Sequence, residues 1–187
     1  MKPENMRLLY EMDKKNYDPN GTRFSRPSVR GIIFRDGKVA MMHSEKYDYY
    51  KFPGGGMERG ESQIQTLIRE VREETGLTVI PSTIQAYGYV HRVEKGYPED
   101  IFEQDNFYYL CEVAAERGEP VPEAYEIEER FSLVYAAPEQ AIGANRAQSH
   151  PEMDWRRKNQ GMLEREALVL ECLMKDPAIH TMQTLLK

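Results

Sequence analysis

The segment at residues 62–75 constrains the fold of this chain more than any other, because its apolar spacing fits a helix packed on one side. Apolar side chains recur there at i, i+3, i+4 and i+7. These side chains are Ile64, Leu67, Ile68 and Val71. Gly76 follows at the position favoured for a helix C-cap. We therefore expect a helix over residues 62–75 that buries this apolar face.

Strand-like runs lie on both sides of this helix. Asp36-Gly37 separates two of them, and both residues tolerate the positive φ of a type I′ hairpin turn. The strand-like runs are residues 29–34, 38–43, 77–80, 85–93, 106–113 and 131–135. Helical patterns follow at residues 138–145 and 162–175, the second stopped by Pro177. Strands and helices that alternate in this way predict an α/β fold with a mixed β-sheet between helices.

The length of 187 residues fits one domain. We expect a core at about residues 28–145, preceded by a polar lead-in with a turn at residues 18–21. A C-terminal helical extension follows the core. An acidic loop is expected at residues 116–130.

Composition and charge exclude several classes of protein. The net charge of −6 argues against a surface that binds long nucleic acid. No run approaches the roughly 18 apolar residues of a membrane span. The charged N-terminus does not resemble a secretory signal, so a cytoplasmic location is expected. Cys111 and Cys172 lie far apart and outside any CxxC pair, which argues against a zinc site or a disulfide framework.

The same helix carries a set of carboxylates. Glu70, Glu73 and Glu74 fall within an arc of about 100° beside the apolar face. Like charges at these spacings repel by a few tenths of a kcal/mol, roughly, per pair, and a bound divalent cation would reverse that sign. Oxygen-only ligation suits Mg²⁺ or Mn²⁺. Glu61, just ahead of the helix, is a candidate for a further ligand or for orienting a metal-bound water.

The alternative is a solvated, salt-bridged face, since Arg69 and Arg72 lie among these glutamates. The preceding residues favour a binding site. A run of glycines at residues 54–56 lets the backbone approach a ligand closely, and Gly60 permits a second tight bend. A short glycine loop by itself is weak evidence for phosphate binding.

Together these residues form one long motif. It reads Gly55-x5-Glu61-x7-Arg69-Glu70-Val71-x-Glu73-Glu74-x-Gly76-Leu77. The motif resembles the Nudix box, G-x5-E-x7-R-E-U-x-E-E-x-G-U with U aliphatic, at every defined position. The strand pattern from about residue 28 to residue 145 is also similar to that of a Nudix domain.

The resemblance implies an α/β/α sandwich and a hydrolase that cuts a phosphoanhydride bond. Its substrate would be a nucleoside diphosphate linked to another moiety: a nucleoside triphosphate, a nucleotide sugar or a dinucleoside polyphosphate. By this similarity Glu70, Glu73 and Glu74 would ligate Mg²⁺ or Mn²⁺, and Glu61 would bind the metal or orient its water. Arg69 would hold the glutamates by ion pairs, and clustered carboxylates with divalent cations would activate water.

The resemblance also implies that Gly54, Gly55 and Gly56 wrap the substrate, with Gly56 standing where relatives often have a larger residue. The general base stays open between a box glutamate and a later carboxylate, for which we favour Glu126, Glu128 or Glu129. A second reading is an inactive Nudix-fold module that senses a nucleotide. Such modules typically lose box glutamates, which this chain keeps. Trp155 is a candidate for a pocket wall or a homodimer contact.

Overall fold

The computed structural model of the chain describes residues 6–147 and 153–179, and it describes side chains over residues 6–147 and 160–179. Its elements, in chain order, are β1 (Leu8–Asp13), β2 (Arg23–Ser25), β3 (Ser28–Ile32), β4 (Phe34–Arg35), β5 (Lys38–Ser44), β6 (Tyr49–Lys51), β7 (Gly54–Gly56), α1 (Gln63–Thr75), β8 (Leu77–Val79), a 3-10 turn (Pro81–Thr83), β9 (Gln85–Lys95), β10 (Ile101–Leu110), β11 (Val113–Arg117), α2 (Ala124–Glu128), β12 (Phe131–Ala136), α3 (Pro138–Arg146) and α4 (Met153–Lys175).

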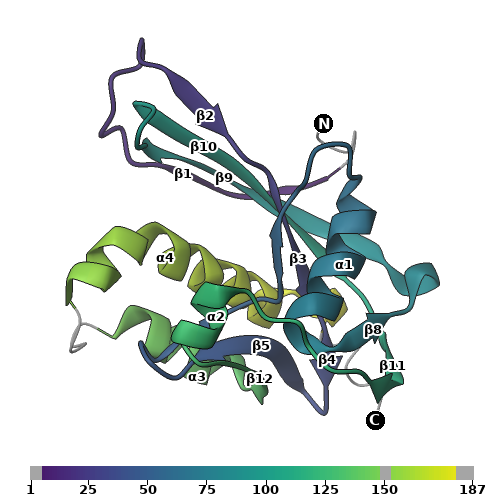
Figure 1. Cartoon of the computed structure of the whole chain (residues 1–187). Helices are drawn as coiled ribbons and strands as arrows, with labels where there is room; N and C mark the ends of the chain where they lie inside the picture. Colours follow the sequence, from purple (N-terminus) through teal and green to yellow (C-terminus); the bar gives the residue numbers. More distant parts are fainter. Residues whose placement is uncertain (1–5, 148–152, 180–187) are drawn as a thin grey trace.

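The largest sheet is mixed, as the sequence predicts. Its strand order is β1-β9-β10-β3-β7, and β2 also pairs with β10. The β9–β10 and β3–β7 pairs are antiparallel, whereas β3 and β1 run parallel to β10 and β9, respectively. A second sheet has the order β12-β5-β4 with β6 on β5, and β8 pairs with β11. β9 and β10 extend beyond the body of the protein with β1 and β2 alongside (Figure 1).

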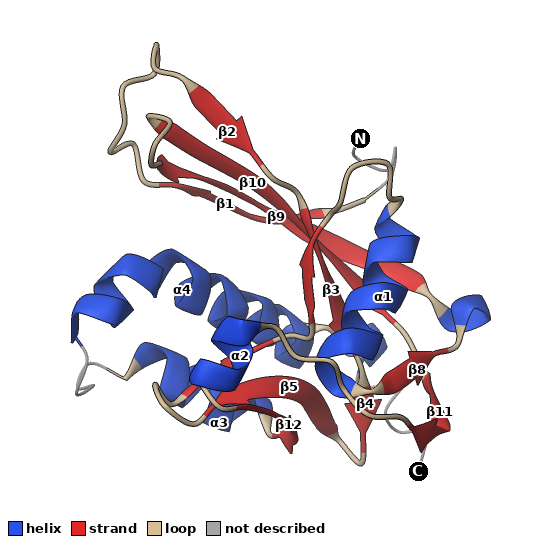
Figure 2. Ribbon diagram, in the orientation of Figure 1, coloured by secondary structure: helices blue, strands red, loops and turns tan. Residues whose placement is uncertain are grey.

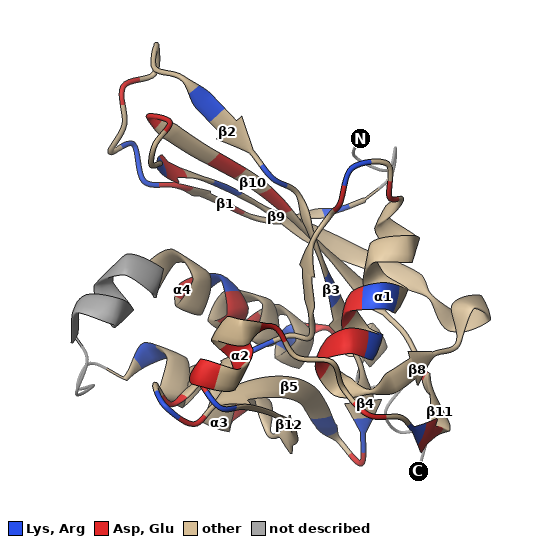
Figure 3. Ribbon diagram, in the orientation of Figure 1, with Lys and Arg blue, Asp and Glu red and all other residues tan. Residues whose placement is uncertain are grey.

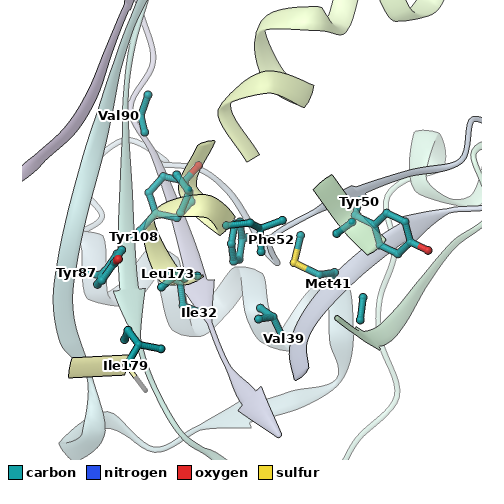
Figure 4. Close-up of a cluster of buried hydrophobic side chains, with 14 residues drawn as sticks. Ile32, Val39, Met41, Tyr50, Phe52, Tyr87, Val90, Tyr108, Leu173 and Ile179 are labelled. Atoms are coloured by element: carbon teal, nitrogen blue, oxygen red, sulfur yellow. The ribbon is translucent and has the colours of Figure 1, made fainter. Parts of the chain in front are cut away.

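Helices cover both faces of the large sheet (Figure 2). Successive side chains of a strand point to opposite faces, and β10 divides accordingly. Phe107 and Tyr109 pack with Leu67 of α1, whereas Tyr108 packs with Leu170 of α4. Figure 4 shows the second cluster, where side chains of β3, β5 and β10 meet those from the C-terminal part of the chain. The expected α/β/α sandwich is confirmed.

Local signals place the ends of α1 and the first hairpin correctly. Ser62 caps α1 and exchanges hydrogen bonds with Gln65, the third residue of the helix, which forms a capping box. Gly76 ends the helix in the left-handed conformation, with φ 73°. Asp36 and Gly37 have φ 49° and 73°, as the type I′ turn requires.

The buried face of α1 differs from the one that the apolar spacing predicts. Leu67 and Val71 are fully buried, but Ile64 is 36% exposed while Thr66 is fully buried. Polar residues can occupy the interior here because they find partners. The Tyr109 hydroxyl donates to Oε1 of Gln63, and the Thr66 hydroxyl donates to a Glu61 carboxylate oxygen. These bonds turn the helix toward its polar side.

Other expectations need correction. The glycine run at residues 54–56, described above as a loop, forms the strand β7, which pairs with β3. The lead-in contains β1 and β2, and residues 116–130 contain the end of β11 and all of α2. The expected strand at residues 106–113 is divided, because β10 begins at Ile101 and ends at Leu110, and Val113 begins β11. These elements depend on pairing with distant strands, which local propensity does not reveal.

The C-terminal helix is longer than predicted, since α4 begins at Met153. The side chain of Trp155 lies outside the described residues. Cys111 is buried and Cys172 half-buried, and neither forms a disulfide. Among the helices that the structure describes, none is long and apolar enough to cross a membrane.

Candidate active site

A polar pocket of about 300 Å³ lies beside α1. Glu70, Glu73 and Glu74 of α1 line it, together with Gly54–Gly56 of β7. Figure 3 shows the acidic positions on α1 and a basic position on the neighbouring strand β3. The sequence singled out all six of these residues, and the structure brings them together around one pocket. Glu61 and Arg69 do not line the pocket, and they contact one another next to it.

Arg69 joins three of the carboxylates. Its Nε and Nη2 donate to the two oxygens of Glu61 at 2.6 and 2.8 Å. Its Nη1 donates to Glu70 at 2.8 Å and to Glu73 at 3.1 Å. The hydrogen bonds from Arg69 lower the pKa of Glu61 to about 2. Burial instead raises the pKa of Glu70 above its ordinary value. One guanidinium thus compensates much of the repulsion among these side chains.

Glu74 is held separately, deeper in the protein. Its Oε1 accepts from Lys51 Nζ at 2.8 Å, and its Oε2 accepts from the backbone N–H of Gly54 at 2.8 Å. Burial raises the pKa of Glu74 to about 7, although Lys51 and Arg30 oppose the shift. Burial disfavours the charged form of a carboxyl group, so this glutamate is the one whose ionisation most needs nearby positive charge.

The glycines of β7 are required by close packing. Gly54 has φ 134°, and a side chain there would collide with the backbone oxygen of Val29. A Cβ at Gly55 would overlap the carboxylate of Glu70. β7 therefore lies directly against the glutamates of α1 because it carries no side chains.

The later acidic segment contributes two glutamates to the pocket, Glu123 and Glu126. Of the three candidates for a general base, Glu126 lines the pocket. Glu128 pairs with Lys46, and Glu129 accepts from the Tyr49 hydroxyl at 2.9 Å. Burial opposes ionisation of Glu126, but the positive charge of Lys51 contributes to a pKa below the ordinary value.

A family model described as the NUDIX domain matches residues 24–156. This chain belongs to the Nudix hydrolase family. A curated relative named RNA pyrophosphohydrolase, from Xanthomonas campestris pv. campestris (strain B100), is 38% identical over 72 residues, which are 38% of this chain and 33% of that protein. A putative ADP-ribose pyrophosphatase from Bacillus subtilis (strain 168) is 24% identical over 94 residues, which are 50% of this chain and 44% of that protein. The matched segment thus spans a third to under half of the length of these relatives.

A solved structure supports the fold. The NUDIX hydrolase from Nitrosomonas europaea matches with a TM-score of 0.50 at 18% identity, covering 74% of this chain and 90% of that chain. The likeness concerns the Nudix fold alone, because identity at this level does not carry substrate or mechanism.

The Nudix pocket also contains basic residues that the sequence analysis missed. Arg26 and Arg30 line it, as does Gln104 of β10. The Arg26 side chain is exposed and makes no ion pair within the described residues, whereas Arg30 donates to the backbone oxygen of Gly54. Both arginines lie within thirty residues before the box. The available sequence signal was that Arg30 lies within the strand-like run at residues 29–34, ahead of the glycine run.

The donor chemistry of the Nudix site fits a hard divalent cation, since Glu70, Glu73 and Glu74 present carboxylate oxygens to one pocket. In the structure these carboxylates are oriented toward Arg69 and Lys51. Within residues 6–147 and 160–179, no three acidic, histidine or cysteine side chains are grouped to hold a metal ion. Ligation would require the carboxylates to rotate away from Arg69 and Lys51. As a metal ligand, Glu61 stays a prediction, because its carboxylate faces Arg69.

Proposed function

We propose that this Nudix protein is a Mg²⁺- or Mn²⁺-dependent pyrophosphohydrolase that cuts a phosphoanhydride bond in a nucleoside diphosphate linked to another moiety. The observation that carries the proposal is the mixed lining of one pocket. Glu70, Glu73 and Glu74 of the box share it with Arg26 and Arg30. Carboxylates supply donors for a hard cation, and guanidinium groups bind phosphate oxygens.

Each set of residues has a role in this proposal. Glu70, Glu73 and Glu74 hold the cation, and Arg69 keeps the first two of them in place before the cation binds. A bound divalent cation neutralises phosphate charge and lowers the pKa of water. Arg26 and Arg30 receive the phosphates.

The remaining roles concern the attacking water and the substrate backbone. Glu126 orients the attacking water, for which its position in the pocket is suited. The backbone of β7 lies against the substrate, since no side chain stands in the way. Glu61 acts through Arg69, to which it is bound by both oxygens.

The pocket size bears on the substrate class. A volume of about 300 Å³ is at the lower end for small-molecule sites. It suits the phosphates and part of one nucleoside, with the linked moiety outside. Two relatives are named for RNA and for ADP-ribose, and both of these molecules can present the same chemical group, a phosphoanhydride next to a nucleoside. The net charge of −6 favours the smaller substrates over long RNA.

The test is a panel of ADP-ribose, nucleotide sugars, nucleoside triphosphates, dinucleoside polyphosphates and a 5′-triphosphorylated oligonucleotide. Each is incubated with Mg²⁺ or Mn²⁺, and products are separated by ion exchange. Reaction in ¹⁸O-labelled water shows which phosphorus is attacked. We expect cleavage of at least one class and loss of turnover in EDTA.

Variants connect this activity to the pocket. Glu73→Gln and Glu74→Gln should each lower kcat by at least about 100-fold. Glu112→Gln is the matched control, because Glu112 is exposed and away from the pocket. Full activity in both folded pocket variants would refute the metal assignment. Nucleotide binding without turnover of any substrate would instead support the sensing module.

A further inference from the structure

Lys51, the last residue of β6, occupies the point where three elements meet. Its side chain is 6% exposed, and its Nζ donates to Oε1 of Glu74 at 2.8 Å and to Oε1 of Glu126 at 3.2 Å. It also donates to the Tyr125 hydroxyl at 3.1 Å. One ammonium group therefore connects the box helix α1 to the short helix α2. Lys51 itself does not line the pocket, so its partners separate it from a ligand there.

The contact is demanding to build. The side chains of Glu74 and Glu126 are 5% and 3% exposed, so two carboxylates and an ammonium have all left water. Removing water from charges is costly unless each finds a partner in good geometry. The aromatic ring of Phe131, whose centroid lies 4.5 Å from Nζ, covers the ammonium further. Such a group specifies one arrangement of the elements that carry it.

α2 depends on this contact for its inward attachment. The helix runs only from Ala124 to Glu128, and Glu126 is its one buried residue. Ile127 of the same helix is 64% exposed, and Tyr125 is 44% exposed. A helix this short is not stable by itself. Two further side-chain contacts of α2 are the ring contact of Tyr125 with Phe131, at 6.3 Å between centroids, and the surface ion pair of Glu128 with Lys46, where Glu128 is 71% exposed.

The two carboxylate oxygens of Glu126 accept hydrogen bonds from different partners. One carboxylate oxygen accepts from the backbone N–H of Glu123 and completes the capping box of α2. The other accepts from Lys51 and from the Tyr125 hydroxyl. Both oxygens are thereby fixed, so the orientation of this carboxylate in the pocket is set by Lys51 on one side and by the helix start on the other.

We propose that Lys51 is a positioning residue, which fixes Glu126 of α2 beside Glu74 of the box helix and so orders the water-activating side of the pocket. The inference rests on the proposed function for its catalytic consequence, but the positioning itself does not require turnover. A lysine buried between two elements thus determines whether the later acidic segment belongs to the site.

Hydrogen exchange of the full-length protein, without substrate, tests the positioning. In Lys51→Met, backbone amides of residues 121–129 should exchange at least about tenfold faster, while those of α1 keep their protection. Lys51→Arg should restore part of the protection, because it keeps the charge. The matched control is Lys46→Met, which removes the exposed lysine contact to the same helix and should change nothing. If Lys51→Met fails to fold, Glu126→Gln tests the same contact from its other side.

Kinetics on the substrate found in the panel test how Lys51 acts. Lys51→Met should lower kcat by about 10- to 100-fold and change KM less than about threefold. Glu126→Gln should lower kcat similarly, and the double variant should lose no more than the larger single loss, because both act through one group.

Each outcome decides one statement. Unchanged exchange at residues 121–129 in both Lys51→Met and Glu126→Gln would overturn the positioning role. Losses that multiply in the double variant would overturn action through Glu126. Absence of turnover by the wild-type protein on every substrate would refute the proposed function, and the exchange comparison with Lys46→Met would still decide whether Lys51 positions α2.

Discussion

Arg69 donates two hydrogen bonds to the carboxylate of Glu61, one of 2.6 Å from Nε and one of 2.8 Å from Nη2. The two residues lie at opposite ends of the x7 spacing of the box, one ahead of α1 and one in its second turn. The same guanidinium also contacts Glu70 and Glu73. The pair therefore holds the loop before α1 against the helix. The third nitrogen of the guanidinium, Nη1, remains for Glu70 and Glu73.

Replacement of Arg69 by lysine should separate geometry from charge. A lysine ammonium is a point charge that cannot match both oxygens of Glu61 while also reaching Glu70. We expect kcat to fall by about 10- to 100-fold in the Arg69→Lys variant, with the fold retained by circular dichroism. Arg59→Lys, at an exposed position that makes no side-chain hydrogen bond in the described residues, should behave as wild type. Equal rates for the two variants would contradict the assignment.

Glu61 should make stability depend on acidity. Its pKa is lowered from 4.5 to about 2, chiefly by hydrogen bonds from Arg69. A depressed folded-state pKa adds stability that is present above the unfolded value and is lost as pH falls toward the folded value. In urea unfolding, the deficit of Glu61→Gln relative to wild type should be largest above pH 4.5 and shrink toward pH 2. A deficit that stays constant over this window would argue against the ion pair.

Two neighbouring glycines should respond differently to alanine. At Gly54, with φ 134°, the new Cβ would meet the backbone of Val29, which cannot move cheaply. Gly54→Ala should lower the free energy of unfolding by about 3 kcal/mol or more. At Gly55 the new Cβ meets the end of the flexible Glu70 side chain. Gly55→Ala should therefore fold with nearly normal stability and lose activity, as unfolding curves and kcat would show. Equal unfolding midpoints for both variants would contradict this distinction.

Gly143 and Gly37 allow the effect of backbone conformation on stability to be measured without a steric clash. A Cβ at either position meets no atom within 4 Å, but Gly37 has φ 73° in the hairpin turn while Gly143 lies inside α3. Gly143→Ala should raise the free energy of unfolding by about 0.5–1 kcal/mol, because glycine weakens a helix. Gly37→Ala should lower it by about 1 kcal/mol, because a left-handed conformation disfavours a side chain. Chemical unfolding of the two variants measures both signs.

Much of the site follows from local sequence. The helix ends at Ser62 and Gly76 depend on capping within a few residues, so the sequence predicts them correctly. The side-by-side placement of Glu70 and Glu73 follows from helical periodicity alone. Strand alternation likewise places Tyr108 on the opposite face of β10 from Phe107 and Tyr109. Each of these features involves residues close together in the chain.

Other features exist only in the folded chain. Lys51 has no pattern around it that indicates a role, and its two carboxylate partners lie 23 and 75 positions away. Which of the later glutamates lines the pocket depended on where α2 packs, and only Glu126 of the three candidates does so.

The inward face of α1 likewise depends on the folded chain, because Gln63 accepts from the Tyr109 hydroxyl, 46 positions away, while Ile64 is left exposed. The sequence by itself determined the box helix and the chemistry of its carboxylates, because periodicity and capping act over one or two turns. Only the tertiary structure decided which charges face one another, because burial and pairing are set by elements that meet from remote parts of the chain.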